Sequence, residues 1–219
     1  MTKLILVRHG QSQSNVAKCF NGQTDSPLTD LGKEQAVLTA KFIKDNYKID
    51  KVYASDLQRA YYTGQKIAEF SNVPIVKSVG MREIFVGEWE DKDSNFLLKR
   101  DDFKLWLTDI ANAEPENGET VRDFSKRILD TLNQIVNENP DKTIVVATHA
   151  TPVRVFETFI TTGGIDEMQS RAWVSNASCS VFNYENGKWS IEQMDICEHL
   201  EGKITRLVDP RVTDCEKSL

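Results

Sequence analysis

The chain has 219 residues, of which 40% are hydrophobic and 27% charged, and its formal net charge is −6. These values are typical of a soluble globular protein and argue against a general nucleic-acid-binding protein, which would be basic. No signal sequence is visible, and no apolar run reaches the ~18 residues of a membrane span. We therefore expect a cytoplasmic protein that contacts no membrane.

In the first part of the chain, short apolar runs alternate with segments that have helical periodicity. The wholly apolar run 4–7 predicts a strand covered on both faces, and the polar segment 10–28 predicts a loop. Thr29 is expected to cap a helix that reaches about Tyr47. Beyond it we expect a strand at 51–54, a helix that opens with a capping box of Ser55 and Gln58, and a strand at 74–79.

The second part begins with the least regular stretch, residues 88–117, which we expect to form an excursion over one face around a short helix near 96–110. Next come a helix from about 118 that ends before Pro140, a strand at 143–149, and a helix with Thr151 as its cap and Pro152 at its first position. Asn186-Gly187 lies between strand-like runs at 179–184 and 188–194, which predicts a β-hairpin.

This alternation of strands and helices indicates an α/β fold with a mostly parallel sheet. We expect a three-layer α/β/α arrangement and a single domain over residues 1–200. Residues 201–219 are expected to be a polar C-terminal extension. The four cysteines form no CxxC pair, and their spacing suits neither a zinc site nor a disulfide framework, so we expect them to be reduced.

Five residues that can bind or transfer a phosphoryl group follow the predicted strands. Ligands of parallel sheets bind at the carboxyl ends of the strands. Arg8 and His9 end the first strand, and Arg59 lies in the first helical turn after the second. Glu83 follows the third strand, and His149 ends the strand at 143–149. We expect all five at one rim of the sheet.

These residue types suit phosphoryl transfer without a metal or a cofactor. The planar donor fork of arginine matches phosphate oxygens, and Gly10 lets the backbone approach a ligand closely. His9 can attack phosphorus and carry the phosphoryl group. Glu83 can protonate the leaving oxygen and then deprotonate water. His149, just before a helix N-terminus, can donate to the transferring oxygens, so fixed positive groups supply the charge stabilisation.

Seven segments of the chain, taken in order, resemble the histidine phosphatase superfamily, the phosphoglycerate-mutase-like group. They are "LVRHGQSQSN", "DSPLTDLGKEQA", "YASDLQRAYYTGQKIA", "REIFVGEWE", "PENGETVRDFSKRI", "VVATHATPVR" and "NASCSVFNYE". The resemblance implies that His9 is the phosphorylated nucleophile and Glu83 the proton donor. It also implies that Arg8, Arg59 and His149 form the rest of the phosphate pocket.

At other positions matched by this resemblance the role of the residue stays open. Asn15 stands where the family often contacts phosphate, although an asparagine there can also be a loop-capping amide. We also expect Gly22 to contact the substrate, and the roles of Gln11 and Ser12 stay open. The chain departs from many relatives, which have glycine, at two positions: Asp91 and Ala150.

The expected function is hydrolysis of a small phosphomonoester, and the alternative is a cofactor-dependent phosphoglycerate mutase. Family mutases tend to carry a longer insert before the second histidine, with basic residues that grip the substrate. Here 65 residues separate Glu83 from His149, and the excursion that would cover the substrate has few basic residues. They are Lys92, Lys99, Arg100 and Lys104. A non-catalytic binding module and a metal-dependent enzyme fit less well, and a homodimer is possible.

Some further residues have two open interpretations. The aromatic residues of the excursion can line an apolar substrate wall or pack in the core. Arg82 can contact substrate or pair at the surface, and His199 is expected to be structural or exposed. Asn176 and Ser178 can orient the pocket. The aromatic residues are Trp89, Phe96, Phe103 and Trp106.

Overall fold

The computed structural model describes residues 1–206, and 207–219, most of the expected C-terminal extension, lie outside the described residues. The central sheet has six strands in the order β4-β3-β6-β1-β7-β8. β4, β3, β6 and β1 are parallel, and β7 and β8 add an antiparallel hairpin beside β1. The strands are β1 (Thr2–Arg8), β3 (Lys51–Ala54), β4 (Ile75–Lys77), β6 (Thr143–Thr148), β7 (Cys179–Glu185) and β8 (Lys188–Ile196). The expected α/β fold with a mostly parallel sheet is confirmed.

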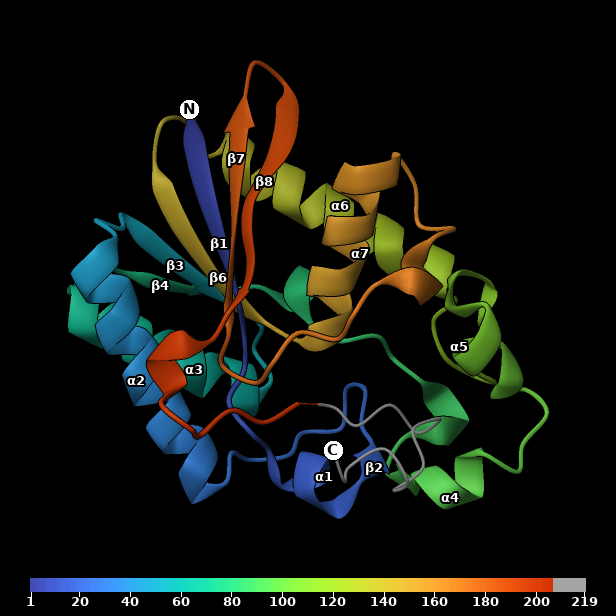
Figure 1. The fold of residues 1–219 in the computed structure, drawn as a ribbon. Coiled ribbons are helices and arrows are strands. Elements are labelled where there is room, and N and C mark those ends of the chain that lie inside the picture. The colour runs from blue at the N-terminus through green and yellow to red at the C-terminus, as the bar shows by residue number, and fades with distance from the viewer. Residues whose placement is uncertain (207–219) are drawn as a thin grey trace.

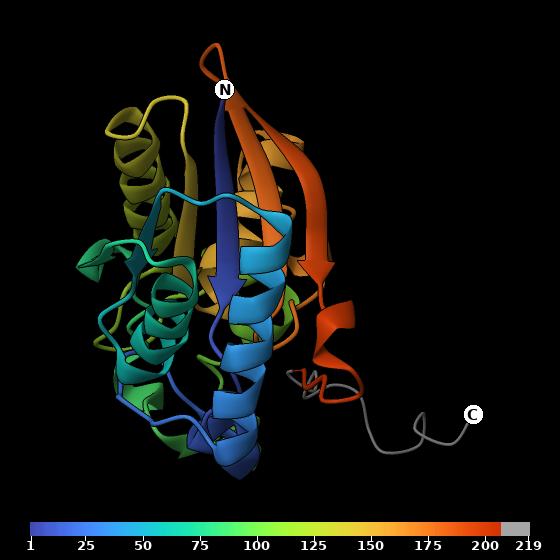
Figure 2. The ribbon, with the colours of Figure 1, turned by 90° about the vertical axis from the view of Figure 1, so that its left-hand side faces the viewer.

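Helices cover both faces of this sheet, α2 (Asp30–Asn46) and α3 (Gln58–Ser71) on one side, α6 (Val121–Asn137) and α7 (Ala150–Thr162) on the other (Figures 1 and 2). Successive side chains of a strand point to opposite faces. Leu4 and Leu6 of β1 therefore pack in the cluster that contains α6 and α7, while Ile5 and Val7 pack with α2 and α3. The apolar run is thus buried on both sides, which fixes the position of the polar residues that follow it.

Short elements cover the carboxyl ends of the parallel strands. They are α1 (Gln13–Ala17), β2 (Cys19–Phe20), β5 (Lys92–Asp93), α4 (Ser94–Leu97) and α5 (Lys104–Thr108). β2 pairs with β5, which ties the segment after β1 to the excursion at 88–117. Figures 1 and 2 show α1, β2 and α4 below the ends of the strands. The expected loop at 10–28 therefore contains a short helix and a strand, and the single helix expected near 96–110 is replaced by α4 and α5.

The aromatic residues of the excursion are mostly core residues. Trp89, Phe103 and Trp106 are buried and meet Phe20 edge to face, with ring centroids 5.0–6.1 Å apart. These three rings therefore pack in the core, and the alternative prediction that they line an apolar substrate wall is wrong. Phe96 alone of the predicted set is exposed, at 50%.

Two predicted helix caps are wrong. α3 begins at Gln58 with Leu57 as N-cap, so Ser55 and Gln58 form no capping box. α7 begins at Ala150 with His149 as N-cap, so Thr151 lies inside the first turn. The Ser55 hydroxyl lies 2.9 Å from Nε2 of His149, and the Thr151 N–H donates to Glu83. The strand expected at 74–79 is also shorter, because a 3-10 helix starts at Val79.

The chain after β8 packs back onto α2. A 3-10 helix (Glu198–Leu200) brings the His199 ring parallel to Phe42, with centroids 4.6 Å apart, and within 3.0 Å of the Thr39 hydroxyl. His199 is therefore a structural residue. Within residues 1–206, no helix combines the length and the apolar character needed to cross a bilayer.

Candidate active site

The structure brings the five candidate residues together at the carboxyl ends of the strands. Arg8 ends β1 and His9 follows it, Arg59 is the second residue of α3, and His149 follows β6. Glu83 comes two residues after the 3-10 helix Val79–Met81. All five side chains are buried, and the rings of His9 and His149 meet at an angle of 65° with centroids 5.2 Å apart.

Backbone carbonyls hold both arginines. Arg8 donates from Nη1 to the Val174 carbonyl at 2.6 Å. Arg59 donates to the carbonyls of Gly22 and Thr24 at 2.6 and 3.0 Å. Burial lowers the pKa of both arginines, that of Arg8 to about 10, so both are cationic at neutral pH. Because carbonyls carry no net charge, the two guanidinium charges remain to attract an anion.

The hydrogen bond of His9 determines which ring nitrogen is free. Nδ1 lies 2.6 Å from the carbonyl oxygen of Gly10, which can only accept, so Nδ1 carries the hydrogen. The lone pair therefore belongs to Nε2. Burial, reinforced by the charges of Arg59 and Arg8, holds the pKa of His9 well below its usual value. His9 is thus a neutral imidazole at pH 7, with a free electron pair for attack.

His149 is a second neutral imidazole. Its Nε2 lies 2.9 Å from the Ser55 hydroxyl. Burial is the main reason that its pKa lies well below the usual value, and the positive charge of Arg59 lowers it further. Within residues 1–206, its Nδ1 and the Nε of Arg8 are buried without a hydrogen-bond partner. Such groups are costly unless a ligand satisfies them. Ser55 follows β3 directly, so the strand-end rule identifies its position, but the expected capping box gave it another role.

Glu83 is held by two backbone N–H groups. Ile84 donates to Oε1 at 2.9 Å, and Thr151, whose N–H in the first turn of α7 has no helical partner, donates to Oε2 at 3.3 Å. Burial has the larger effect and raises the pKa of Glu83. Burial therefore makes this carboxyl hold its proton more strongly than a glutamate in water does. With two neutral histidines and two cationic arginines beside it, the site suits a doubly charged anion such as a phosphate monoester.

The loop that holds Arg59 is itself organised by Glu90. The backbone N–H groups of Gly22, Gln23 and Thr24 donate to the Glu90 carboxylate at 3.1, 2.8 and 3.0 Å. A Cβ atom at Gly22 would lie 2.3 Å from the Ile84 carbonyl oxygen, so this turn requires glycine. The expected contact of Gly22 with substrate stays a prediction. Glu90 was not predicted, because its role depends on a turn far away in the sequence.

Asn15 acts as a capping residue in this structure. Its Oδ1 accepts from the Ser12 N–H at 3.1 Å, which closes a capping box at the start of α1, and from Nδ2 of Asn176 at 3.1 Å. Its contact with phosphate stays a prediction. Asn176 also donates to the His9 carbonyl at 3.3 Å, whereas Ser178 bonds to the Ser175 carbonyl within its own turn.

Arg82 forms a bidentate ion pair with Asp56, at 2.7 and 2.6 Å, which supports the surface-pair interpretation. Asp91 has φ +56°, a conformation that favours glycine and explains why many relatives have glycine there. Among residues 1–206, no three His, Cys, Asp or Glu side chains are grouped so as to hold a metal ion.

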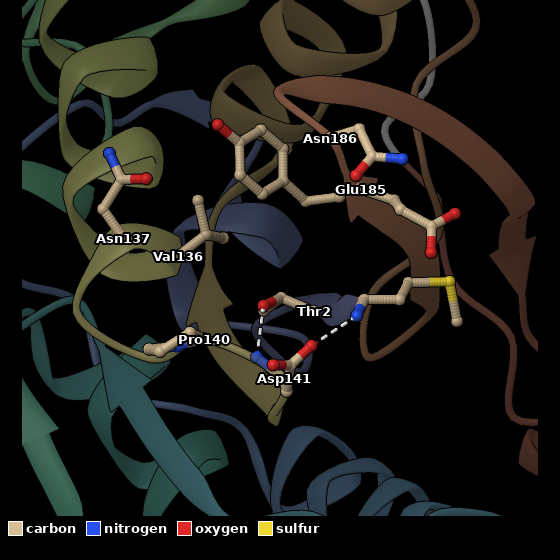
Figure 3. Close-up of a pocket in the computed structure, with 9 residues that line it drawn as sticks. Thr2, Val136, Asn137, Pro140, Asp141, Glu185 and Asn186 are labelled. Carbon is tan, nitrogen blue, oxygen red and sulfur yellow. Dashed lines mark hydrogen bonds and ion pairs between the residues drawn. The ribbon is translucent and has the colours of Figure 1, made fainter.

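A separate pocket of about 280 Å³ lies at the other end of β1 (Figure 3). There the amino group of Met1 pairs with Asp141, and the Asp141 N–H donates to the Thr2 hydroxyl. This pocket does not contain any of the five candidate residues. Its lining consists of Met1, Thr2, Val136, Asn137, Pro140, Asp141, Tyr184, Glu185 and Asn186.

The sequence and the fold both resemble those of known proteins. The family model of the histidine phosphatase superfamily (branch 1) matches residues 4–196. Phosphoserine phosphatase 1 of Hydrogenobacter thermophilus is 31% identical over 91% of this chain and 95% of its own. The structure of Bacillus stearothermophilus YhfR matches with a TM-score of 0.87 and 25% identity over 92% of this chain and 100% of that one. A mutant phosphoserine phosphatase from Entamoeba histolytica, in complex with phosphoserine, has a TM-score of 0.80 and 29% identity, and covers 91% of this chain and 100% of its own.

Proposed function

The chain belongs to branch 1 of the histidine phosphatase superfamily and is a phosphatase, and we propose that it hydrolyses small phosphomonoesters through a phosphohistidine on His9. The observation that supports this most strongly is the contact of His9 Nδ1 with the Gly10 carbonyl, which leaves Nε2 free in a buried site that also holds Arg8 and Arg59. A nucleophile that is deprotonated at pH 7 beside fixed positive charge suits attack on an anionic phosphate.

In the first step, Nε2 of His9 attacks phosphorus while the bond from phosphorus to the leaving oxygen breaks. The protonated Glu83 carboxyl gives its proton to that oxygen, so the product leaves as an alcohol. Arg8 and Arg59 neutralise the charge on the transferring oxygens, and His149 together with the N-terminus of α7 adds donors.

In the second step, water attacks the same phosphorus, and the bond between nitrogen and phosphorus breaks. Glu83, now a carboxylate, takes the proton of the water. Inorganic phosphate is released, and His9 returns to its neutral form. Glu83 thus acts first as an acid and then as a base, which its raised pKa favours.

Phosphoserine is the first substrate to test, because phosphoserine phosphatases occur among both the sequence relatives and the similar structures. A panel of phosphomonoesters with EDTA present, ranked by kcat/KM from phosphate release, measures the activity. We expect His9→Ala to abolish release and His199→Asn, a change of the structural histidine, to retain it. Full activity of His9→Ala would refute the proposal. With 3-phosphoglycerate, transfer to the second hydroxyl with little free phosphate would favour a mutase instead.

A further inference from the structure

Residues 203–206, named the strap here, lie against the loop that carries the nucleophile. In Figure 1 they are the red segment beyond the last 3-10 helix. The Lys203 carbonyl accepts from Nε2 of Gln35 at 2.6 Å, and the Thr205 carbonyl accepts from the Asn176 N–H at 2.8 Å. The Thr205 hydroxyl accepts from Gln35 Nε2 at 3.0 Å and donates to Asn176 Oδ1 at 3.1 Å.

The two amides that hold the strap also hold the nucleophile loop. Gln35 and Asn176 are only 0% and 1% exposed. Oδ1 and Nδ2 of Asn176 have separate tasks, since Nδ2 donates to the His9 carbonyl at 3.3 Å and to Asn15 at 3.1 Å. Oε1 of Gln35 accepts from the Gln11 N–H at 2.8 Å. Thr205 is therefore connected to the segment 9–11 at both of its ends, through Asn176 to His9 and through Gln35 to Gln11.

The Thr205 hydroxyl fixes the Asn176 amide at its oxygen, while the His9 carbonyl and Asn15 Oδ1 accept from its nitrogen. The hydroxyl hydrogen is directed to Asn176 Oδ1, which can only accept, and the hydroxyl oxygen accepts from Gln35. Nδ2 of Asn176 thus faces the His9 carbonyl. An amide whose oxygen loses its donor can rotate and present the wrong atom. In a buried network, one missing partner leaves the other members unsatisfied, which is more costly than at the surface.

The strap also supports the turn that holds Arg8. Arg206 donates to the Ser175 hydroxyl at 2.7 Å and to Asp195 at 3.2 Å. Asp195 in turn accepts from the Ser175 N–H at 2.6 Å. The neighbouring Val174 carbonyl is the acceptor of Arg8. The strap thus contacts residues that support the nucleophile, Gln35 and Asn176, and Arg206 contacts Ser175 in the turn that holds Arg8.

We infer that the strap is a positioning element of the active site and that Thr205 is its positioning residue. The inference rests on the proposed function of His9. Thr205 is the strap residue that is partly buried, and the others are exposed. The strap is therefore attached by hydrogen bonds with little apolar burial, and such segments open easily. Removing the Thr205 hydroxyl weakens the alignment of His9 without changing any group that touches substrate.

The first test compares Thr205→Val, which keeps the shape and loses the hydroxyl, with Thr205→Ser, which keeps the hydroxyl. We expect kcat/KM of Thr205→Val to fall about tenfold, the size expected for one buried unsatisfied partner, mainly through kcat. Thr205→Ser is expected to restore kcat. Equal kcat values for wild type and Thr205→Val would overturn the inference, and so would a loss that serine does not rescue.

The second test measures amide hydrogen exchange in full-length wild type and full-length Thr205→Val, and this measurement needs no catalysis. We expect faster exchange at 9–15 in Thr205→Val. Equal exchange in the two proteins overturns the inference whether or not the protein hydrolyses phosphomonoesters. If wild type forms no phosphohistidine, the proposed function fails separately.

Discussion

At the scale of single residues, burial acts on His9 and Glu83 in opposite directions. It lowers the pKa of the imidazole and raises the pKa of the carboxyl, because both neutral forms are favoured away from water. The same physical effect thus suits the roles that we propose for these residues, His9 as nucleophile and Glu83 as acid. Arg8 and Arg59 keep their charge because burial lowers their pKa values from a much higher starting point.

This pairing predicts the pH dependence of kcat/KM, which reports the free enzyme. Activity should fall at low pH, where His9 is protonated, and at high pH, where Glu83 is ionised. The high-pH limb lies above the usual pKa of a glutamate, since the pKa of Glu83 is raised. Glu83→Gln should lose that limb and lower kcat about 100-fold or more. A profile of Glu83→Gln with the wild-type shape would contradict this assignment.

The grouping of the five candidate residues at one rim was predictable from the sequence, while the residues that support them were not. Each strand end is marked by an apolar run followed by a polar residue, so His9, Arg59 and His149 could be assigned to one rim. Glu90 and Gln35 act through backbone groups that lie far away in the chain. No local pattern marks such a residue, because its partner is set by tertiary packing.

At the scale of elements, the loop after β1 contacts the start of α2 backbone to backbone. A Cβ atom at Gly10 would lie 2.3 Å from the carbonyl oxygen of Gly32. Gly10→Ala is therefore expected to lower the free energy of unfolding by about 3 kcal/mol and to displace His9. At Gly164 the nearest atom to an added Cβ is 4.0 Å away, so Gly164→Ala is the control. Urea denaturation compares the two, and equal stabilities would contradict the packing argument.

Elements with a clear apolar pattern were predicted well, and elements without one were not. The strands at 143–148 and 51–54 contain the apolar runs 144–147 and 52–54, and α6 has apolar residues at helical spacing, so pattern identifies them. α1 has five residues, too few for a period to appear. The start of α7 was placed too late, because Thr151 followed by proline resembles a cap while its backbone N–H in fact bonds to Glu83.

At the scale of the whole molecule, the histidines couple stability to pH. His9, His149 and His199 all have lowered pKa values in the folded chain, with burial as the main cause. Below about pH 6.5 the unfolded chain therefore binds more protons than the folded one, and the free energy of unfolding falls as pH falls. The raised pKa of Glu83 has the opposite sign and partly offsets this loss.

Replacing one buried histidine should reduce this loss. His9→Asn removes a group that must take up a proton on acid unfolding. Its free energy of unfolding is expected to fall less between pH 7 and pH 5 than that of wild type. Urea titrations at several pH values measure the difference. Equal slopes for the two proteins would mean that His9 is not held neutral in the fold.

The most direct test of the proposed mechanism is to trap the phosphoryl group on the protein. The enzyme is mixed with a ³²P-labelled phosphomonoester, stopped in alkali within one turnover and digested for peptide mapping. The label is expected on the peptide that contains His9, to be lost in acid, and to be absent from His9→Ala. Hydrolysis of the substrate with no labelled histidine, or with the label on another residue, would contradict the central claim.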